Sequence, residues 1–492
     1  MKTKIFTLLL TLTISVGTSL ASDTEVDGIW YTFNNSSQTA IVTYRGLYSY
    51  SHSNEYRDTV IIPDTVVYNG AKYSVTGIDQ FAFSDCSDLL CVTIGNNVII
   101  IDENAFASCR KLKSVIIGQN VEHIKYKAFY NCLSLESITL QKKVTTIESG
   151  VFIGCSKLSD IIVSSANANY SSVEGVLFNK EQSLLVYCPN GKQGTYIVPN
   201  SVTDIGDEAF LGSQLTSIVI QNSVVNIGNN VFADCINLST PVYNDEIFAY
   251  LPALYTGEYS IPEGIKIIVH DAFNNCTNLS AITMPSSLTE IEHNAFSYCI
   301  GLTNLKIPNN VVSIGSEAFR GCNKIKIVAL GENLIDLGNA AFSECSMLDS
   351  VLMYSNLLNI GEMTFAYCTN LRSVEIPNSV TSISGGAFFE CKKKKKIINK
   401  ATTPQSIVDD VFYNVSKETC ILYVPENAFT LYKSALVWRD FRNIIGIQIP
   451  EGIDAINPSS KRSSSARKIT RDGQVLVETE NNTYTLTGQE VK

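Results

Sequence analysis

The chain has 492 residues, of which 45% are hydrophobic and 17% charged, and its formal net charge is -10. This apolar content excludes a long disordered polymer. The acidic balance disfavours wrapping of nucleic acid, which needs a surplus of Lys and Arg on one face. The length exceeds one ordinary globular core, so we expect either several domains or an elongated repeat.

The first residues have the features of a secretory signal. Lys2 and Lys4 precede an apolar run from Ile5 to about Val16, and Ser19-Leu20-Ala21 supplies the small residues that a signal peptidase needs. We predict a signal peptide over residues 1–21 and a secreted or outer cell-surface protein. No Cys lies in or beside this segment, which disfavours the bacterial lipoprotein route. No later run of about 20 apolar residues predicts a membrane span.

A repeat runs through most of the chain, marked by Ala-Phe or a close variant. The marks are Phe83, Phe106, Phe129, Phe152, Phe210, Phe232, Phe273, Phe296, Phe319, Phe342, Phe365 and Phe388. In the unit that starts at Phe296, Leu305 and Ile307 alternate with polar neighbours, which is typical of a half-buried strand. One unit is too short to bury its own apolar face, so successive units must stack. We predict a β-rich solenoid, a right-handed superhelix of about 12–13 rungs of about 23 residues.

The repeat also resembles a known family. Phe296 is followed by Cys299, Leu302, Leu305, Ile307 and Pro308, and Phe365 by Cys368, Leu371, Val374, Ile376 and Pro377. This pattern resembles the BspA-like, Bacteroidetes-type bacterial leucine-rich repeats, from about Val60 to Ile447. The resemblance implies secreted or surface-exposed proteins that adhere to host matrix proteins, host cells or other bacteria.

Stacked repeats leave apolar faces at both ends, so we expect caps. We predict an N-terminal β cap over residues 22–75, with a hairpin turn at Asn69-Gly70. The solenoid then covers 76–448, with inserts near 164–200 and 239–265, and the segment from Leu422 to Phe441 closes it with a strand and a helix. A linker over 449–468 and a short β-hairpin tail over 469–492 follow.

A run of five lysines stands near the end of the repeat. Lys394 occupies the position that Leu302 and Leu371 hold in other units, within the run from Lys392 to Lys396. We interpret the run as a solvated edge that discourages addition of another strand. A patch that binds polyanions is the alternative.

Eleven of the fourteen cysteines share one repeat position. Neighbours in such a column lie about one strand spacing apart, and buried free Cys behaves as a small hydrophobic residue. We predict a structural column of thiols rather than disulfides or a metal site, because bridge geometry would have to be met at every pair. The column is Cys86, Cys109, Cys132, Cys155, Cys235, Cys276, Cys299, Cys322, Cys345, Cys368 and Cys391. Cys91, Cys188 and Cys420 lie outside it, and a bridge among these three is left open.

Histidines and catalytic motifs supply little chemistry. His270 and His293 each stand three residues before a Phe mark, and we predict that they lie side by side in an exposed polar column. A zinc site would lack two further ligands, so no metal and no cofactor are expected. No nucleophile elbow, zinc-binding His-Glu pair, phosphate loop or dinucleotide fingerprint is present, and we predict that the chain is not an enzyme.

Each unit presents one outward side chain between two inward strand residues. The candidate binding face consists of Thr139, Ile162, Val219, Thr283, Lys306, Leu352 and Glu375. This mixed row suits an extracellular protein better than a small molecule, although strand propensity alone also favours β-branched residues there. We predict a monomeric adhesin without nucleic-acid partners. The alternatives are a structural surface-layer component and a glycan-capture protein of a polysaccharide-utilisation system, which the absence of aromatic residues from the row disfavours.

Overall fold

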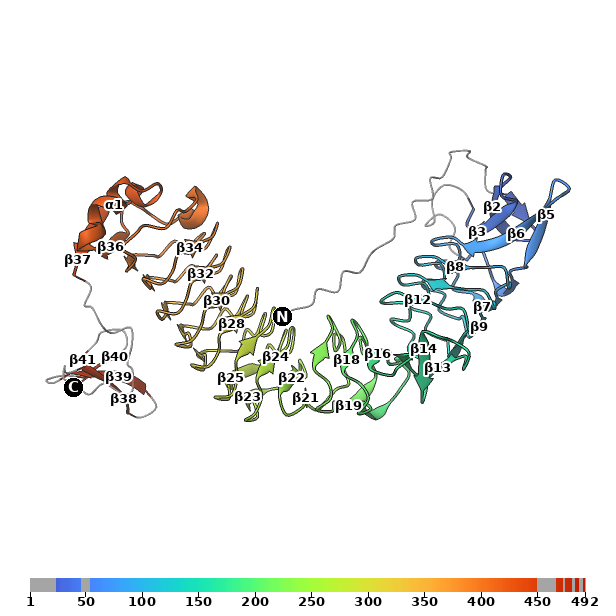
Figure 1. Ribbon diagram of the computed structural model, residues 1–492, viewed down its shortest axis with the longest axis horizontal. Helices are drawn as coiled ribbons and strands as arrows, with labels where there is room; N and C mark the ends of the chain where they lie inside the picture. Colours follow the sequence, from blue (N-terminus) through green and yellow to red (C-terminus); the bar gives the residue numbers. More distant parts are fainter. Residues whose placement is uncertain are drawn as a thin grey trace. The chain divides into compact units, whose positions relative to one another are not determined.

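The computed structural model describes residues 24–45 and 54–448 and four strands within 466–491. The predicted signal peptide lies outside these residues. The chain divides into two units, Met1–Gly446 and Ile447–Lys492. The first is a β-solenoid of about 16 turns with about 23 residues in each (Figure 1). The predicted fold class is therefore confirmed, and the turns outnumber the Ala-Phe marks because several turns lack the mark.

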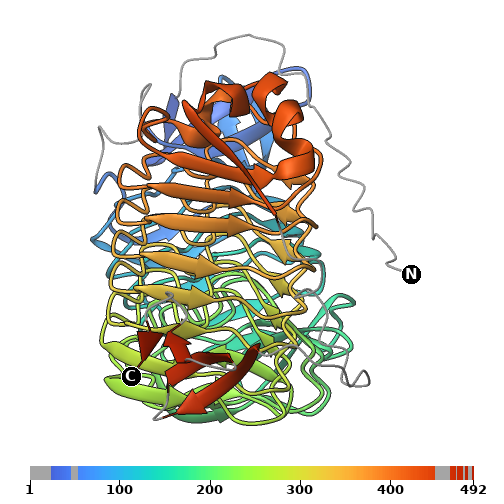
Figure 2. The same ribbon diagram turned by 90° about the vertical axis from the view of Figure 1, so that its left-hand side faces the viewer.

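Most turns contribute two strands, which pair in parallel with those of the next turn. In the row that we call the face strands, Val328 lies opposite Val351 and Ala329 opposite Leu352. In the row that we call the back strands, Ile314 lies opposite Leu337. Successive strands of the last turns lie parallel in Figure 2. One apolar residue of each strand therefore points into a shared core, as the alternating pattern predicts.

The face strands are β4 (Asp58–Ile61), β7 (Leu89–Thr93), β9 (Ser114–Ile116), β11 (Ser137–Leu140), β13 (Asp160–Val163), β17 (Gly194–Ile197), β19 (Leu215–Val219), β23 (Gly257–Ser260), β25 (Leu279–Thr283), β27 (Leu305–Lys306), β29 (Ile327–Ala329), β31 (Ser350–Leu352), β33 (Ser373–Ile376), β35 (Lys396–Asn399), β36 (Ile421–Pro425) and β37 (Asn443–Ile447). The back strands are β8 (Ile100–Ile101), β10 (His123–Ile124), β12 (Thr146–Ile147), β18 (Asp204–Ile205), β20 (Asn226–Ile227), β24 (Ile267–Ile268), β26 (Glu290–Ile291), β28 (Ser313–Ile314), β30 (Asp336–Leu337), β32 (Asn359–Ile360) and β34 (Ser382–Ile383).

The loop that carries each Phe mark bends sharply twice. In the Phe365 turn, Met363 and Tyr367 have φ angles of 55° and 60°, and in the Phe388 turn Gly386 and Glu390 both have a φ angle of 62°. Left-handed backbone is favourable only for Gly and tolerable for Asn and Asp. Two such bends on either side turn the Phe ring inward, where the Phe side chains of the marks are buried.

Stacked rings and thiols fill the core behind these loops. Phe319 lies 5.0 Å from Phe296 and 5.2 Å from Phe342, measured between ring centroids, with the rings nearly parallel. The stack continues past the predicted marks to Phe412, 5.5 Å from Phe388. Phe412 was missed because its spacing from Phe388 is longer by one residue and because Val415 stands where the other units have Cys.

Two shortened turns interrupt the regular stack, each within a predicted insert. In the first, β14 (Tyr170–Val173), β15 (Val176–Asn179) and β16 (Leu184–Tyr187) form an antiparallel meander, and β16 then pairs in parallel with β18. In the second, β21 (Val242–Tyr243) and β22 (Ile247–Tyr250) pair antiparallel, and β22 pairs in parallel with β24. Strand β15 divides the core, because Val176 and Phe178 pack toward the later turns and Leu177 toward the earlier ones.

A buried asparagine begins each shortened turn. The Asn167 side-chain amide donates to the carbonyl oxygens of Gln141 and Val144, at 2.9 and 3.0 Å. Asn244 repeats the arrangement on the preceding turn, with both donations at 3.1 Å. The two amides satisfy carbonyl groups that the departing chain would otherwise leave unpaired.

Both ends of the first unit are covered. Strands β1 (Thr24–Val26), β2 (Ile29–Asn34), β3 (Thr39–Thr43), β5 (Thr65–Tyr68) and β6 (Ala71–Ile78) cover the N-terminal end, and β6 pairs with β8 of the solenoid. At the other end lie 3₁₀ turns η2 (Asp409–Phe412), η3 (Glu426–Ala428) and η4 (Trp438–Asp440) and helix α1 (Phe429–Ser434). Trp438 is buried there, and its indole NH donates to the Gln405 carbonyl at 2.9 Å.

The interpretation of the lysine run as an edge is wrong. Strand β35 pairs with β36, so the face sheet continues past the run. Lys394 is 2% exposed, its ammonium nitrogen has no hydrogen-bond partner among the described residues, and it lies 4.6 Å from the Phe388 ring centroid. The side chain therefore fills the Leu position of its turn, and only its neighbours in the run face solvent.

The second unit contains an antiparallel sheet of β38 (Ala466–Arg471), β39 (Gln474–Thr479), β40 (Thr483–Thr485) and β41 (Glu490–Val491). The expected hairpin corresponds to β39 and β40. Strand β38 begins at Ala466, so the predicted linker boundary at residue 468 is too late by three residues, because the alternation of Arg467 to Arg471 was not recognised as a strand.

Candidate functional site

The predicted binding residues all lie on face strands, with their side chains at the outward positions. Thr139, Ile162, Val219, Thr283 and Lys306 are exposed, whereas Leu352 and Glu375 are partly covered. Each stands beside inward neighbours that are buried or partly covered, such as Ile138 and Leu140 on either side of Thr139. In Figure 1, β13, β19, β23 and β25 lie along the outer side of the curved stack.

The row does not belong to one continuous sheet. Thr139 and Ile162 are adjacent on β11 and β13, but Val219 lies in the two-stranded sheet of β17 and β19 and Thr283 in that of β23 and β25. Lys306, Leu352 and Glu375 lie in a fourth sheet, which runs from β27 to β37. The two shortened turns separate β13 from β17 and β19 from β23, and a further break lies between β25 and β27. The structure therefore brings the residues together only within each sheet.

The row also extends beyond the residues that the repeat predicts. Strand pairing places Ile61 beside Thr93, Ile197 beside Val219 and Tyr423 beside Ile398. These three residues were missed because their turns lack the Ala-Phe mark, although the spacing of Ile421 to Val424 alternates like the other strands. Tyr423 corrects the expectation of a row without aromatic residues, and Lys396 lies 5.3 Å from its ring centroid.

Exposed apolar surface gathers in the first half of the row. Ile61 is 66% exposed, Ile116 58%, Ile162 50%, Ile197 60% and Val219 42%. In the second half the row is polar or partly covered, and Glu375 pairs with Lys400 at 2.6 Å. Surface-exposed ion pairs contribute little to stability, so this half is a solvated surface, whereas the first half retains apolar area that water covers poorly.

The cysteines of the thiol column are free and buried. Within residues 54–448, which hold all fourteen cysteines, every cysteine is free, and all except Cys91 are buried. Most column thiols donate to the carbonyl of the Phe one turn earlier, as Cys322 does to Phe296 at 3.1 Å. Burial raises the pKa of the Cys322 thiol to about 12 and that of Cys391 to about 11. A nucleophilic or metal-binding cysteine needs the opposite shift.

The histidine pair differs in part from its prediction. The rings of His270 and His293 stack at 4.9 Å with 6° between their planes, but His270 is 9% exposed and therefore not in an exposed column. Its Nδ1 contacts Glu292 at 3.1 Å and its Nε2 contacts the Gly228 carbonyl. Burial lowers the pKa of His270, but the hydrogen bonds to Glu292 and Gly228 outweigh burial and raise it overall. No group of three or more His, Cys, Asp or Glu residues suited to a metal occurs in the described ranges.

The features described above define a leucine-rich-repeat protein. They are parallel strands repeated at a constant spacing, an inward column of Leu, Phe and Cys, and an outward row of mixed side chains. The BspA type leucine rich repeat region matches residues 76–189, 186–250, 243–372 and 358–477. The chain belongs to this family, whose repeats suggest protein–protein interaction.

Among solved structures, the comparison found bacterial leucine-rich-repeat proteins. A protein from Bacteroides ovatus is 22% identical, with 87% of this chain and 100% of that chain covered and a TM-score of 0.37. A leucine rich cell surface protein from Faecalibacterium prausnitzii is 21% identical, with 82% and 95% covered and a TM-score of 0.36. The pneumococcal vaccine antigen PcpA is 19% identical, with 88% and 100% covered and a TM-score of 0.34. No curated protein matches the chain.

Membrane insertion by a helix has no support in the described residues, where no helix is both long and apolar enough to cross a bilayer.

Proposed function

We propose that the protein is exported and binds another extracellular protein through the first half of the outward row, as an adhesin at a cell surface. The observation that carries this proposal is the exposed apolar row of Ile61, Ile116, Ile162, Ile197 and Val219. Contiguous exposed apolar area on a soluble protein marks an interaction surface more often than chance. The signal sequence predicted from residues 1–21 supports export.

A flat row on rigid strands suits a protein partner. Backbone hydrogen bonds to the neighbouring turns hold these side chains in place, so binding does not require ordering of the surface, and this lowers the entropic cost of association. A few central apolar residues usually supply most of the affinity of such an interface. We therefore expect Ile116 and Ile162 to be more important than the threonines between them.

The test replaces two isoleucines of the row by threonine, the residue found at the same position in other turns. Ile116→Thr with Ile162→Thr keeps strand propensity and removes apolar surface. Purified chain is tested by surface plasmon resonance against fibronectin, laminin, collagen and intact bacterial cells. We expect binding to at least one of these, weakened about tenfold or more in the double variant, which is about 1.4 kcal/mol.

The matched control is Val312→Thr with Ile335→Thr. These residues are exposed to a similar degree, 41% and 40%, but lie just before the back strands β28 and β30. Equal loss of binding in both double variants, or unchanged binding after loss of Ile116 and Ile162, would count against the row. Light scattering on the same samples separates adhesion from layer formation, because self-association of the wild type that the isoleucine variant abolishes would favour a layer.

A further inference from the structure

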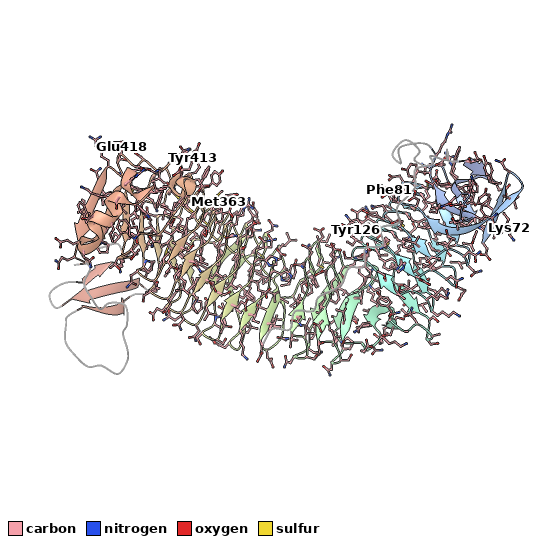
Figure 3. All side chains as sticks on the ribbon, turned by 45° about the horizontal axis from the view of Figure 1, so that its top comes forward. Lys72, Phe81, Tyr126, Met363, Tyr413 and Glu418 are labelled. Carbon is pink, nitrogen blue, oxygen red and sulfur yellow. The ribbon has the colours of Figure 1, made fainter. Side chains whose placement is uncertain are left out.

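The shortened turns leave notches in the side of the solenoid that carries the Phe loops, the side where Tyr126 and Met363 are labelled in Figure 3. In a regular turn, the Phe mark follows the back strand by five positions, as Phe273 follows Ile268. In the second shortened turn Phe248 pairs with Ile268, but Leu251, only three residues on, takes the place of the Phe. Two loop residues are therefore missing, and the turns before and after cannot close over the gap.

The notch at this turn is a cavity of about 320 Å³ between the Phe232 loop and the Phe273 loop. Its floor includes Phe232 and Tyr250, whose ring centroids are 5.6 Å apart. His270 spans the missing loop, since its Nε2 contacts the carbonyl of Gly228, 42 residues earlier in the chain. The opening beside this bridge is large enough for one or two side chains of a partner.

Apolar side chains flank the notch. Ile236 is 80% exposed and Leu254 76% exposed, more than any other large apolar residue among those described. Ile236 lies in the Phe232 loop and Leu254 in the shortened turn, and both line the opening. Exposure of large apolar side chains costs free energy in water, and contact with an aliphatic ligand recovers part of it.

The polar groups of the notch accept hydrogen bonds and carry negative charge. Asp234 and Asp271 line it, and no Lys or Arg is among its lining residues. The Asn274 amide donates to Asp271 at 2.9 Å, which leaves its buried Oδ1 without a hydrogen-bond partner within residues 54–448. The one imidazole of the notch, His270, contacts Glu292. The carboxylates of Asp234 and Asp271 therefore have no Lys or Arg beside them in the lining of the notch.

The first shortened turn provides an internal comparison. There Cys188 takes the place of the Phe, and the notch is smaller, about 160 Å³. Tyr187 lines this notch, and its hydroxyl donates to the Phe152 carbonyl at 2.9 Å. Glu208 also lines this notch. Burial raises the pKa of Glu208, and the positive charge of Lys127 opposes this effect. The first notch therefore has both less room and a nearby cation.

We infer that the second notch binds a lysine or arginine side chain of a partner protein, with an aliphatic neighbour of that residue against Ile236 and Leu254. The aliphatic stem of such a side chain covers apolar surface while its head reaches acceptors, and an Arg head donates to several oxygens at once. This site is separate from the outward row and does not depend on the proposed function.

The probe is a fluorescein-labelled peptide, Gly-Leu-Arg-Leu-Gly, compared by fluorescence polarisation with its Lys, Gln and Glu counterparts on the full chain. We expect the Arg and Lys peptides to bind about tenfold more tightly than the Gln peptide, the Glu peptide not to bind, and added salt to weaken the cationic peptides. Equal binding of the Arg and Gln peptides, or binding of neither, would overturn the inference.

Variants locate the site. Asp234→Asn with Asp271→Asn should weaken the Arg peptide about tenfold, and Leu254→Ser should weaken the Arg and Gln peptides alike. The matched control at the first notch, Glu208→Gln, and the row variant Ile116→Thr with Ile162→Thr should bind as the wild type does. Circular dichroism melts of each variant verify folding. An unchanged Kd in the Asp234 and Asp271 variant, with an unchanged melt, would place the peptide elsewhere and contradict the assignment.

Discussion

Alkaline pH should unfold the solenoid steeply, because its buried thiols must stay protonated. Burial raises the pKa of twelve cysteines, for example to about 12 in Cys235 and Cys276 and about 11 in Cys86. An unfolded chain has a Cys pKa of about 8.5. A group whose pKa is raised on folding contributes stability that is complete below the unfolded pKa and is lost as the pH rises toward the folded pKa.

The magnitude follows from the number of thiols. As the pH rises from about 8.5 to the folded pKa of a buried thiol, that thiol lowers the free energy of unfolding by about 1.4 kcal/mol per pH unit. Twelve acting together give an upper bound of about 16 kcal/mol per unit, which exceeds the whole stability of a typical domain, about 5–15 kcal/mol. We therefore expect loss of structure within about one to two pH units above 8.5.

Urea unfolding followed by circular dichroism at about pH 7.5, 8.5 and 9.5 measures this effect, with Cys322→Ala as the probe. The variant loses the buried sulfur, which costs about 1 kcal/mol at the lowest pH. Because it also loses one titrating group, its disadvantage should shrink by about 1 kcal/mol between pH 8.5 and 9.5. Val328→Ala, a buried neighbour without a titratable group, should show a constant deficit. A constant deficit for Cys322→Ala as well would refute the reasoning.

Two further predictions concern buried and exposed members of the same turns. Lys394→Met should raise the free energy of unfolding by about 1–3 kcal/mol at pH 7. The reason is that burial lowers the pKa of the Lys394 amine, which has no hydrogen-bond partner among the described residues. The cost of burying the charged amine is present below its folded pKa and disappears above the unfolded pKa of about 10.4. Lys393→Met, an exposed change, should shift stability by less than about 0.5 kcal/mol, and equal effects in urea melts would contradict a special role for Lys394. Iodoacetamide should label the native chain at Cys91, the one cysteine that is not buried, and should label all fourteen cysteines after unfolding. Mass spectrometry identifies the labelled residues, and rapid labelling of the column cysteines in the native chain would contradict a closed core.

The regular part of the fold could be predicted from the sequence because each turn repeats the same pattern of buried and exposed residues. Phe296, Cys299 and Leu302 recur at one spacing, and only stacking buries such a set. The outward row follows from the same alternation, so the strand positions of Thr139, Thr283 and Lys306 could also be assigned. What binds to that row is not encoded in the spacing, and it stays a prediction.

The departures could not be predicted because they depend on which turns lie side by side. Leu251 replaces a Phe only because β22 pairs with β24 after two loop residues are lost. His270 is buried for the same reason, since the missing loop lets its ring reach Gly228. Lys394 is buried because the next turn covers it, although a run of lysines by itself favours solvent.

These departures are also where the surface acquires its own chemistry. A stack of identical turns pairs its backbone and buries its apolar side chains equally along its length, so a regular turn offers only its outward row. Loss of two residues in one turn removes the cover from its neighbours without disturbing the aromatic stack, because Tyr250 still packs on Phe232 and Phe248 on Phe273. The first notch is smaller, is lined by Tyr187 and Glu208 and lies near Lys127, whereas the second is larger, has no Lys or Arg in its lining and is flanked by two exposed aliphatic side chains. This difference in room and in nearby positive charge is the reason to expect a cationic ligand at the second notch.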